Sequence, residues 1–255
     1  MLLSSSHSRF LVVLLLGLFA GGIALSQGRS VSEQYLLAAA NQDRVANSLR
    51  PVRLDPLLSA AALVHAREMA AHRAISHRFP GEADLADRVA NAGVPFSLVT
   101  ENVAEASNSA LVHELWMKSP GHRANLLDAQ VDSIGIAVLA VQGQLYAVED
   151  FARTVAVISF QEQEGRVGGL LEGSGVIVSS DPVDARRTCK MESGYSGTPQ
   201  PWFVMRYTTA TLARLPEQLA ARLSTGKYRR AAVGACTPSK STPFSSYSIA
   251  VMLYP

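Results

Sequence analysis

The chain has 255 residues, of which 48% are hydrophobic and 17% are charged, and its formal net charge is only +2. This composition excludes an intrinsically disordered chain, a collagen and a coiled coil. The length allows one large domain or two small ones, each with a proper hydrophobic core. The basic excess is too small to indicate nucleic acid as a partner.

The first 26 residues are predicted to be a secretory signal peptide. Arg9 precedes an apolar run over residues 10–20, and the small residues Ala24 and Ser26 favour cleavage near Gln27. The alternative is an uncleaved anchor, although the run is shorter than the ~20 residues that a membrane-spanning helix needs. No second candidate span follows in the sequence. We therefore expect a secreted protein, extracellular or periplasmic, with no transmembrane segment after cleavage.

The sequence contains only two cysteines, Cys189 and Cys236. They are too few for a disulfide scaffold and too far apart for a zinc ribbon or a redox motif. Outside the cytoplasm such a pair is free to oxidise. We expect a Cys189–Cys236 disulfide, the alternative being two buried thiols.

Charge and residue usage divide the mature chain near residue 154. Residues 27–154 carry 11 Lys and Arg against 14 Asp and Glu, whereas residues 155–255 carry 11 against 7. All histidines beyond the leader lie in the first half and both cysteines lie in the second. We predict two domains, residues 31–154 and 155–255. The alternative is one continuous domain in which residues 155–160 form a further strand of the first sheet.

The first half is predicted to contain helices followed by a hairpin. Asp55 is a good N-cap and Pro56 a good first helical residue. Gln142 and Gly143 separate two β-rich segments, a pattern typical of a hairpin. The expected helices cover residues 31–49, 56–72, 83–92, 109–118 and 121–127, and the expected strands cover residues 134–141 and 145–151.

The second half has the pattern of a small α+β module. Five glycines between Gly165 and Gly175 match no phosphate-binding motif, so we expect a flexible turn between strands there. Strands are predicted over residues 155–160, 175–179, 202–208, 229–235 and 247–254, with a helix over residues 216–223.

Seven short motifs follow one another in the first half. They are Asn41-x-x-Arg44, Leu54-Asp55-Pro56-x-Leu58, Ser76-His77, Glu101-Asn102-Val103-Ala104, the run from Trp116 to Leu127 with Ser119-Pro120-Gly121-His122-Arg123-x-Asn125, Ile134-Gly135-Ile136-Ala137, and Asp150-Phe151-Ala152. In this order they resemble the CAP superfamily of cysteine-rich secretory, antigen 5 and pathogenesis-related 1 proteins, in the form of its bacterial SCP-like extracellular branch. The resemblance covers residues 33–153.

The resemblance implies an α+β fold, namely a CAP-type α-β-α sandwich, followed here by the small α+β C-terminal module. It also implies a cleft lined by two histidines and two acidic residues. Carried over by position, the cleft residues are His77, Glu101 and His122. The second acid of the family falls on Leu111. His113 and Glu114 are the further cleft candidates, although their offset around the helix means that neither need point into the same cleft.

Two imidazoles and a carboxylate allow three roles. His77, His122 and Glu101 are suitable ligands for a divalent metal such as zinc. They also suit proton transfer, or a hydrogen-bond network that holds the cleft together. No nucleophile is evident, because Ser119 lacks the surroundings of a nucleophile elbow and is better interpreted as an N-cap.

Other polar residues of the first half are interpreted as structural. His65 and His72 are seven residues apart on one helix, about 10 Å along its axis, too far to share an ion. They are interpreted as packing residues. Asn102, Arg123 and Asn125 are expected to satisfy backbone groups of the turn that follows the fourth helix.

We therefore expect a secreted binding module whose cleft engages an extracellular lipid, glycan or protein, rather than an enzyme. The sequence requires no cofactor, and zinc is the metal that the three candidate ligands would suit. The alternative is a metal-dependent extracellular hydrolase acting on envelope polymers or peptides. Leucine at position 111 weakens this catalytic interpretation more than it weakens a binding one.

Overall fold

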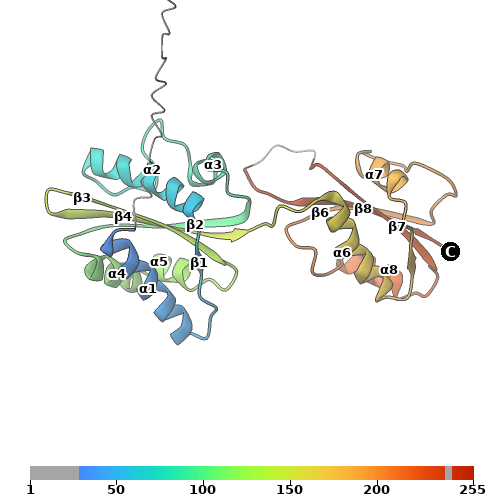
Figure 1. The fold of residues 1–255 in the computed structure, drawn as a ribbon, viewed down its shortest axis with the longest axis horizontal. Coiled ribbons are helices and arrows are strands. Elements are labelled where there is room, and N and C mark those ends of the chain that lie inside the picture. The colour runs from blue at the N-terminus through green and yellow to red at the C-terminus, as the bar shows by residue number, and fades with distance from the viewer. Residues whose placement is uncertain (1–28, 239–242) are drawn as a thin grey trace, which may run out of the picture.

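The computed structural model describes residues 29–238 and 243–255. The predicted signal peptide over residues 1–26 lies outside these residues. Within them, no helix combines the length and the apolar character needed to cross a lipid bilayer. The described chain forms two units, each built on a four-stranded sheet (Figure 1). We call residues 31–154 the N-terminal unit and residues 155–255 the C-terminal unit.

The N-terminal unit is an α-β-α sandwich, as the resemblance implied. Its sheet has the strand order β1-β3-β4-β2, in which only β1 and β3 are parallel. Helices α2 and α3 cover one face, and α1, α4 and α5 cover the other (Figure 1). The elements are α1 (Val31–Ala46), β1 (Arg53–Leu54), α2 (Pro56–His72), α3 (Leu85–Asn91), β2 (Phe96–Ala106), α4 (Ser109–Lys118), α5 (Pro120–Leu126), β3 (Ser133–Val141) and β4 (Gln144–Thr154).

Local signals in the sequence place several of these elements. Asp55 caps α2 by accepting hydrogen bonds from the backbone N–H groups of Leu57 and Leu58. Gln142 and Gly143 adopt positive φ values of 51° and 81°, which lets β3 and β4 form the predicted hairpin. Strand β2 was not predicted, and it becomes one edge of the sheet.

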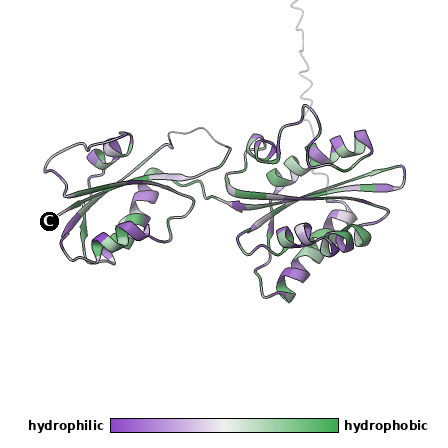
Figure 2. Cartoon of the chain, turned by 180° about the vertical axis from the view of Figure 1, so that it is seen from behind, coloured by the Kyte–Doolittle hydropathy of each residue, from purple (hydrophilic) through white to green (hydrophobic). Residues whose placement is uncertain are grey.

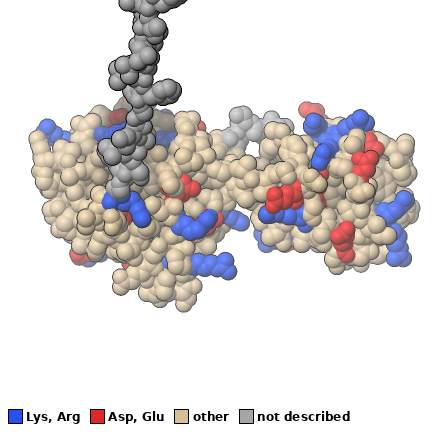
Figure 3. Space-filling view, viewed as in Figure 1, with Lys and Arg blue, Asp and Glu red and all other residues tan. Residues whose placement is uncertain are grey.

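Apolar side chains fill both interfaces between the sheet and its helices. Leu36, Trp116 and Phe151 are fully buried on the α1 side, and Leu58 and Met69 on the α2 side. Figure 2 shows hydrophobic residues recurring along the helices and strands of both units. Among the described residues on the face drawn in Figure 3, basic and acidic side chains lie in small separate groups of both signs.

Gly135 explains the Ile-Gly-Ile motif of β3. A Cβ atom at this position would overlap backbone atoms of Leu58 and Ser59 in α2. Only glycine therefore allows the helix to lie this close to the strand. The close approach fixes α2, which contributes to the candidate site.

Asn41 and Arg44 fasten the segment that follows α1. The Asn41 side chain exchanges two hydrogen bonds with the backbone of Val52. Arg44 is only 1% exposed, and its side chain donates several hydrogen bonds to backbone carbonyl groups. Its guanidinium donates to the carbonyl oxygens of Arg50, Leu126, Asp128 and Val131.

The C-terminal unit is a smaller α+β module, as predicted. Its sheet has the strand order β5-β7-β8-β6, with only β5 and β7 parallel. A disulfide joins Cys189 to Cys236, which confirms the predicted pairing. The elements are α6 (Phe160–Glu172), β5 (Ile177–Val178), α7 (Val183–Cys189), β6 (Phe203–Thr209), α8 (Glu217–Leu223), β7 (Arg230–Cys236) and β8 (Tyr247–Tyr254).

Two expectations for this unit are wrong. Residues 155–159 form no strand, and α6 begins at Phe160 because Ser159 caps it by accepting from the backbone N–H of Glu162. The glycine-rich stretch is largely this helix rather than a flexible turn. Buried Val167 and Leu171 anchor α6 in the core, so tertiary packing outweighs the low helix propensity of glycine.

Candidate functional site

The candidate site lies at the free edge of strand β2, where segments from both faces of the sheet meet. Glu101 belongs to β2, His77 to the segment after α2, and His122 to α5. The imidazole ring centroids of His77 and His122 are 6.1 Å apart. The structure therefore brings together the three residues singled out in the sequence, and we call them the His77 site.

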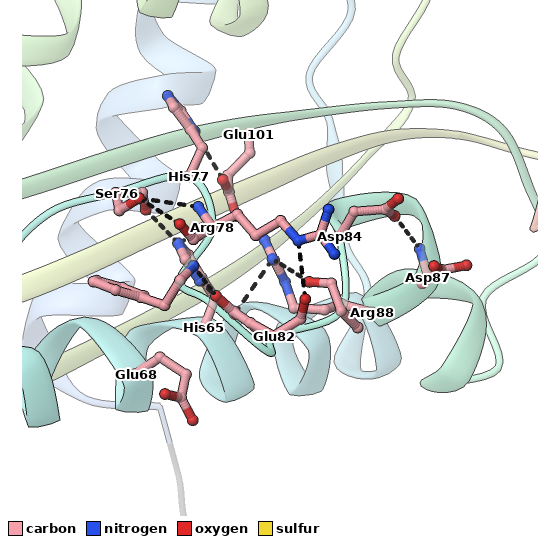
Figure 4. A network of polar contacts seen from close by, with 12 residues as sticks. His65, Glu68, Ser76, His77, Arg78, Glu82, Asp84, Asp87, Arg88 and Glu101 are labelled. Carbon is pink, nitrogen blue, oxygen red and sulfur yellow. Dashed lines mark hydrogen bonds and ion pairs between the residues drawn. The ribbon is translucent and has the colours of Figure 1, made fainter.

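Each carboxylate oxygen of Glu101 contacts a neighbouring side chain. Its side chain is 3% exposed, and its Oε1 lies 2.8 Å from Nδ1 of His77 (Figure 4). Its Oε2 accepts a hydrogen bond from Nη2 of Arg88, a buried residue of α3. Both oxygens of this carboxylate are thus engaged inside the protein.

A second layer of polar residues lies beneath Glu101 (Figure 4). His65 is fully buried, with Nδ1 2.6 Å from Oε1 of Glu82 and Nε2 2.6 Å from the carbonyl oxygen of Ser76. Glu82 Oε1 also lies 3.3 Å from Nη1 of Arg88. The network links α2, α3 and β2, so it orients Glu101 and, through it, His77.

Sequence reasoning missed most of this second layer. His65 was interpreted as a packing residue, and neither Glu82 nor Arg88 was singled out. One signal was present, because a histidine in the middle of the apolar face of α2 needs buried hydrogen-bond partners. His72, by contrast, is exposed and stacks on Phe79 with ring centroids 4.3 Å apart.

Two asparagines tie α5 to β2 and so position His122. The Asn102 side chain donates to the carbonyl oxygen of His122 at 3.1 Å. Asn125 donates to the carbonyl oxygen of Glu101 at 3.1 Å and to Oδ1 of Asn102 at 3.0 Å. These contacts agree with the structural role expected for both asparagines. Arg123 is exposed and takes no part in them.

The surroundings shift the pKa values of the two imidazoles in opposite directions. The hydrogen bond to Glu101 is the main cause that raises the pKa of His77 above 6.5. Burial lowers the pKa of His122 below 6.5, and the positive charge of His77 lowers it further. As the pH falls, His77 therefore gains its proton before His122 does.

The further cleft candidates on α4 have partners elsewhere. Nε2 of His113 lies 2.7 Å from Oδ2 of Asp43 in α1, and Glu114 pairs with Lys118 at the surface. This corrects the expectation that either residue completes the site. The helix turns His113 onto α1 and Glu114 toward solvent, while Leu111 is 37% exposed.

The residues present do not fit a zinc site. Both oxygens of Glu101 are engaged by His77 and Arg88, which leaves two imidazoles as ligands. Protein zinc sites use three or four protein ligands. In the part of the chain that the structure describes, no group of three or more His, Cys, Asp or Glu side chains is arranged to hold a metal ion.

Two more carboxyl groups lie on β4 beside the site. Glu149 and Asp150 are fully buried, and neither carboxyl group has a hydrogen-bond partner among the described residues. Burial raises the pKa of each well above its ordinary value. Asp150 is the cross-strand neighbour of Glu101, whose charge raises the pKa of Asp150 further, against the opposing effect of Arg88.

The N-terminal unit combines an α-β-α sandwich with two histidines and a buried glutamate at the edge of its sheet. Residues 37–157 match the model of the cysteine-rich secretory protein family, CAP. The N-terminal unit of this chain belongs to that family.

Two curated relatives come from Bacillus subtilis (strain 168). The chain is 27% identical over 108 residues to the uncharacterized protein YkwD, a match that covers 42% of each chain. It is 28% identical over 111 residues to the uncharacterized membrane protein YlbC, covering 43% of this chain and 32% of that protein. The matches therefore span less than half of either relative.

Among solved structures, an extracellular protein containing an SCP domain from Bacillus anthracis str. Ames is 27% identical. That match covers 48% of this chain and 40% of the other, with a TM-score of 0.45.

Proposed function

We propose that this chain is a secreted CAP-type binding module whose His77 site engages an extracellular lipid, glycan or protein. The supporting observation is the engagement of both Glu101 oxygens, one by His77 and one by Arg88. A catalytic base or a metal ligand must reach the substrate or the ion, whereas the Glu101 side chain is only 3% exposed and already contacts two neighbouring side chains. Glu101 instead sets the orientation and proton affinity of His77.

The two imidazoles offer a ligand complementary hydrogen bonds. The side chain of His77 is 63% exposed, and its raised pKa favours the charged ring, which only donates. His122, with its lowered pKa, keeps a neutral ring that also accepts. Such a pair suits a hydroxyl or carboxylate group of a ligand.

No observation favours the hydrolase alternative. Among the contacts of the described residues, neither imidazole is hydrogen-bonded to a serine, threonine or cysteine side chain. Ser119 stands at the N-cap of α5 but its hydroxyl does not cap the helix. A binding role needs no nucleophile beside the imidazoles, whereas a hydrolase that uses a serine, threonine or cysteine would need one.

The test uses the mature protein with two probes, isolated bacterial cell-wall sacculi in a pelleting assay and phosphatidylethanolamine–phosphatidylglycerol vesicles in a flotation assay. We expect retention by one probe to fall about tenfold in His77→Ala and in His122→Ala. Each substitution removes one hydrogen bond between the ligand and an imidazole, which is worth about a factor of ten in affinity. Arg123→Ala is the matched surface control and should bind like wild type.

Libraries of ester, peptide and glycan substrates complete the experiment. The proposal expects no turnover by the wild type. Turnover that disappears in His122→Ala would establish an enzyme instead. Retention that survives both histidine substitutions would place binding away from the His77 site.

A further inference from the structure

The two units follow one order of elements. Each runs helix, strand, helix, strand, helix, strand, strand, and the N-terminal unit adds one helix at the second and third helical positions. The sheet orders β1-β3-β4-β2 and β5-β7-β8-β6 are the same, and only the first strand of each is paired in parallel. In Figure 1, α7 covers its sheet as α2 and α3 do, while α6 and α8 lie on the opposite face as α1, α4 and α5 do.

One close helix–strand contact recurs at the same place. Gly135 of β3 lies against Leu58, the third residue of α2, so closely that a Cβ atom would overlap backbone atoms. Gly234 of β7 lies in the same way against Ala185, the third residue of α7. Two glycines thus mark equivalent positions in the two sheets.

The strand registers agree at these glycines. Gly135 and Glu101 both pair with the same residue of β4, Asp150. Gly234 and Arg206 both pair with the same residue of β8, Ala250. Arg206 therefore stands at the position of Glu101.

The side chain of Arg206 also points to the equivalent face. It donates from Nε to the carbonyl oxygen of Thr188 in α7 at 2.7 Å, and from Nη2 to the carbonyl oxygen of Gly194. Glu101 likewise faces α2 and α3, where it meets Arg88. The position is the same, but its chemistry has changed from a carboxylate to a guanidinium that binds the backbone.

We infer that residues 160–254 form a second, reduced copy of the N-terminal unit, in which the counterpart of the His77 site lacks both its histidines and its carboxylate. Arg206 replaces Glu101 and is used to hold the segment after α7. All histidines of the sequence lie before residue 155. The chain therefore carries one histidine site, in its first unit, and this consequence alone rests on the proposed function.

The copy is reduced mainly at the helix over the site. Helix α2 has 17 residues and α7 has 7. The sheet positions that α2 covers, Val103, Ala137 and Val148, are apolar and lie in one buried cluster. Counted from the paired residues, their counterparts are Thr208, Cys236 and Ser248, which line a groove of about 460 Å³. The groove lies where the second half of α2 would be.

The disulfide occupies an equivalent helix–strand contact. Cys189 lies four residues after Ala185 and Cys236 two residues after Gly234. The same offsets in the first unit lead to Ala62 and Ala137, which belong to one buried cluster. The covalent link thus replaces apolar packing that the short helix α7 does not provide.

This correspondence predicts where a new disulfide forms. The double variant Ala62→Cys/Ala137→Cys of the full mature chain should contain a second disulfide, beside Cys189–Cys236, in non-reducing peptide mapping by mass spectrometry. The matched control Ala61→Cys/Ala137→Cys moves one cysteine to a neighbouring position in a different cluster and should keep free thiols. Free thiols at 62 and 137 in folded protein, or equal oxidation of both pairs, would overturn the inference.

A second measurement covers the case in which the cysteine variants do not fold. Gly135→Ala and Gly234→Ala should each lower the melting temperature by about 10 °C, because each Cβ meets backbone atoms that cannot move aside. Gly169→Ala is the control, since its Cβ enters open space on a helix. Wild-type stability of Gly234→Ala would contradict the shared contact. Both readouts are independent of whether the His77 site binds a ligand.

Discussion

At the scale of single residues, Glu101 determines how His77 and His122 differ. One carboxylate oxygen of Glu101 accepts a hydrogen bond from Arg88, and the other lies against Nδ1 of His77. The carboxylate therefore orients the imidazole of His77. Among the described residues no carboxylate pairs with the His122 ring, and His122 is held through its backbone by Asn102. The site at this strand edge thus contains one imidazole with a raised pKa, that of His77, and one with a lowered pKa, that of His122.

The buried carboxyl group of Glu149 should make the free energy of unfolding depend on pH. Burial raises its pKa in the folded state well above the unfolded value of about 4.3. Above that value the folded state binds more protons than the unfolded state. The contribution of protonated Glu149 to the free energy of unfolding is therefore fully present below about pH 4.3 and is lost as the pH rises through the folded pKa. Glu149→Gln should make this decline shallower in urea unfolding measured between about pH 4.5 and pH 8, leaving the part that the raised pKa of Asp150 causes.

The matched control for that experiment is Glu114→Gln, because Glu114 is half exposed and its ion-pair partner among the described residues is the exposed Lys118. Its unfolding curves should follow the wild type at every pH. A decline in Glu149→Gln as steep as in the wild type would show that Glu149 is not the group responsible.

The site residues fall into two groups by how far sequence predicts them. His77, Glu101 and His122 were found because they lie in motifs, and the structure brings them together. Glu82 and Arg88 lie in no motif, and their role arises only when α3 folds over α2 and β2. A residue that supports a site through tertiary contacts leaves no local spacing to detect.

At the scale of elements, Arg44 links α1 to the segment between α5 and β3. Arg44→Ala would leave four backbone carbonyl groups without their donor, three of them after residue 125. We expect a loss of about 3 kcal/mol or more in the free energy of unfolding, measured by chemical denaturation. Arg123→Ala removes an exposed arginine and should change it by less than about 0.5 kcal/mol. Equal effects would contradict the linking role.

Elements with strong local signals were predicted closely. Helix α4 has its expected bounds, residues 109–118, and α2 begins at Pro56 after its Asp55 cap. Strand β2 was missed because both of its faces are partly covered and it carries Glu101 in its middle, which obscures any alternation. Helix α6 was missed because glycine content outweighed one usable signal, the spacing of Ser159 and Glu162.

At the scale of the whole molecule, the disulfide stabilises the C-terminal unit. Cys189 and Cys236 are 47 residues apart, and closing a loop of that size is worth about 4 kcal/mol on the chain-entropy model. Cys189→Ala/Cys236→Ala should lower the unfolding free energy of this unit by about that amount, monitored by Trp202 fluorescence. The N-terminal unit, which contains no cysteine, should unfold as in the wild type. A loss shared equally by both units would contradict this assignment.

We propose that the domain boundary lies between residues 153 and 165. Strand β4 ends at Thr154, and residues 155–159 belong to no helix or strand. The units nevertheless touch where the Phe96 and Phe244 rings pack with centroids 5.2 Å apart. Limited proteolysis should yield a stable N-terminal fragment of about 130 residues, because exposed connecting segments are cut first. Cleavage that never leaves such a fragment would favour one continuous domain.

The proposed role of the His77 site depends most on Glu101 acting through His77. Nuclear magnetic resonance titration of the imidazole signals in the mature protein tests this directly, in the wild type and in Glu101→Gln. We expect His77 to titrate above pH 6.5 and His122 below it, and the pKa of His77 to fall in Glu101→Gln because burial then acts unopposed. A His77 pKa at or below 6.5 in the wild type, or one that Glu101→Gln leaves unchanged, would contradict the account.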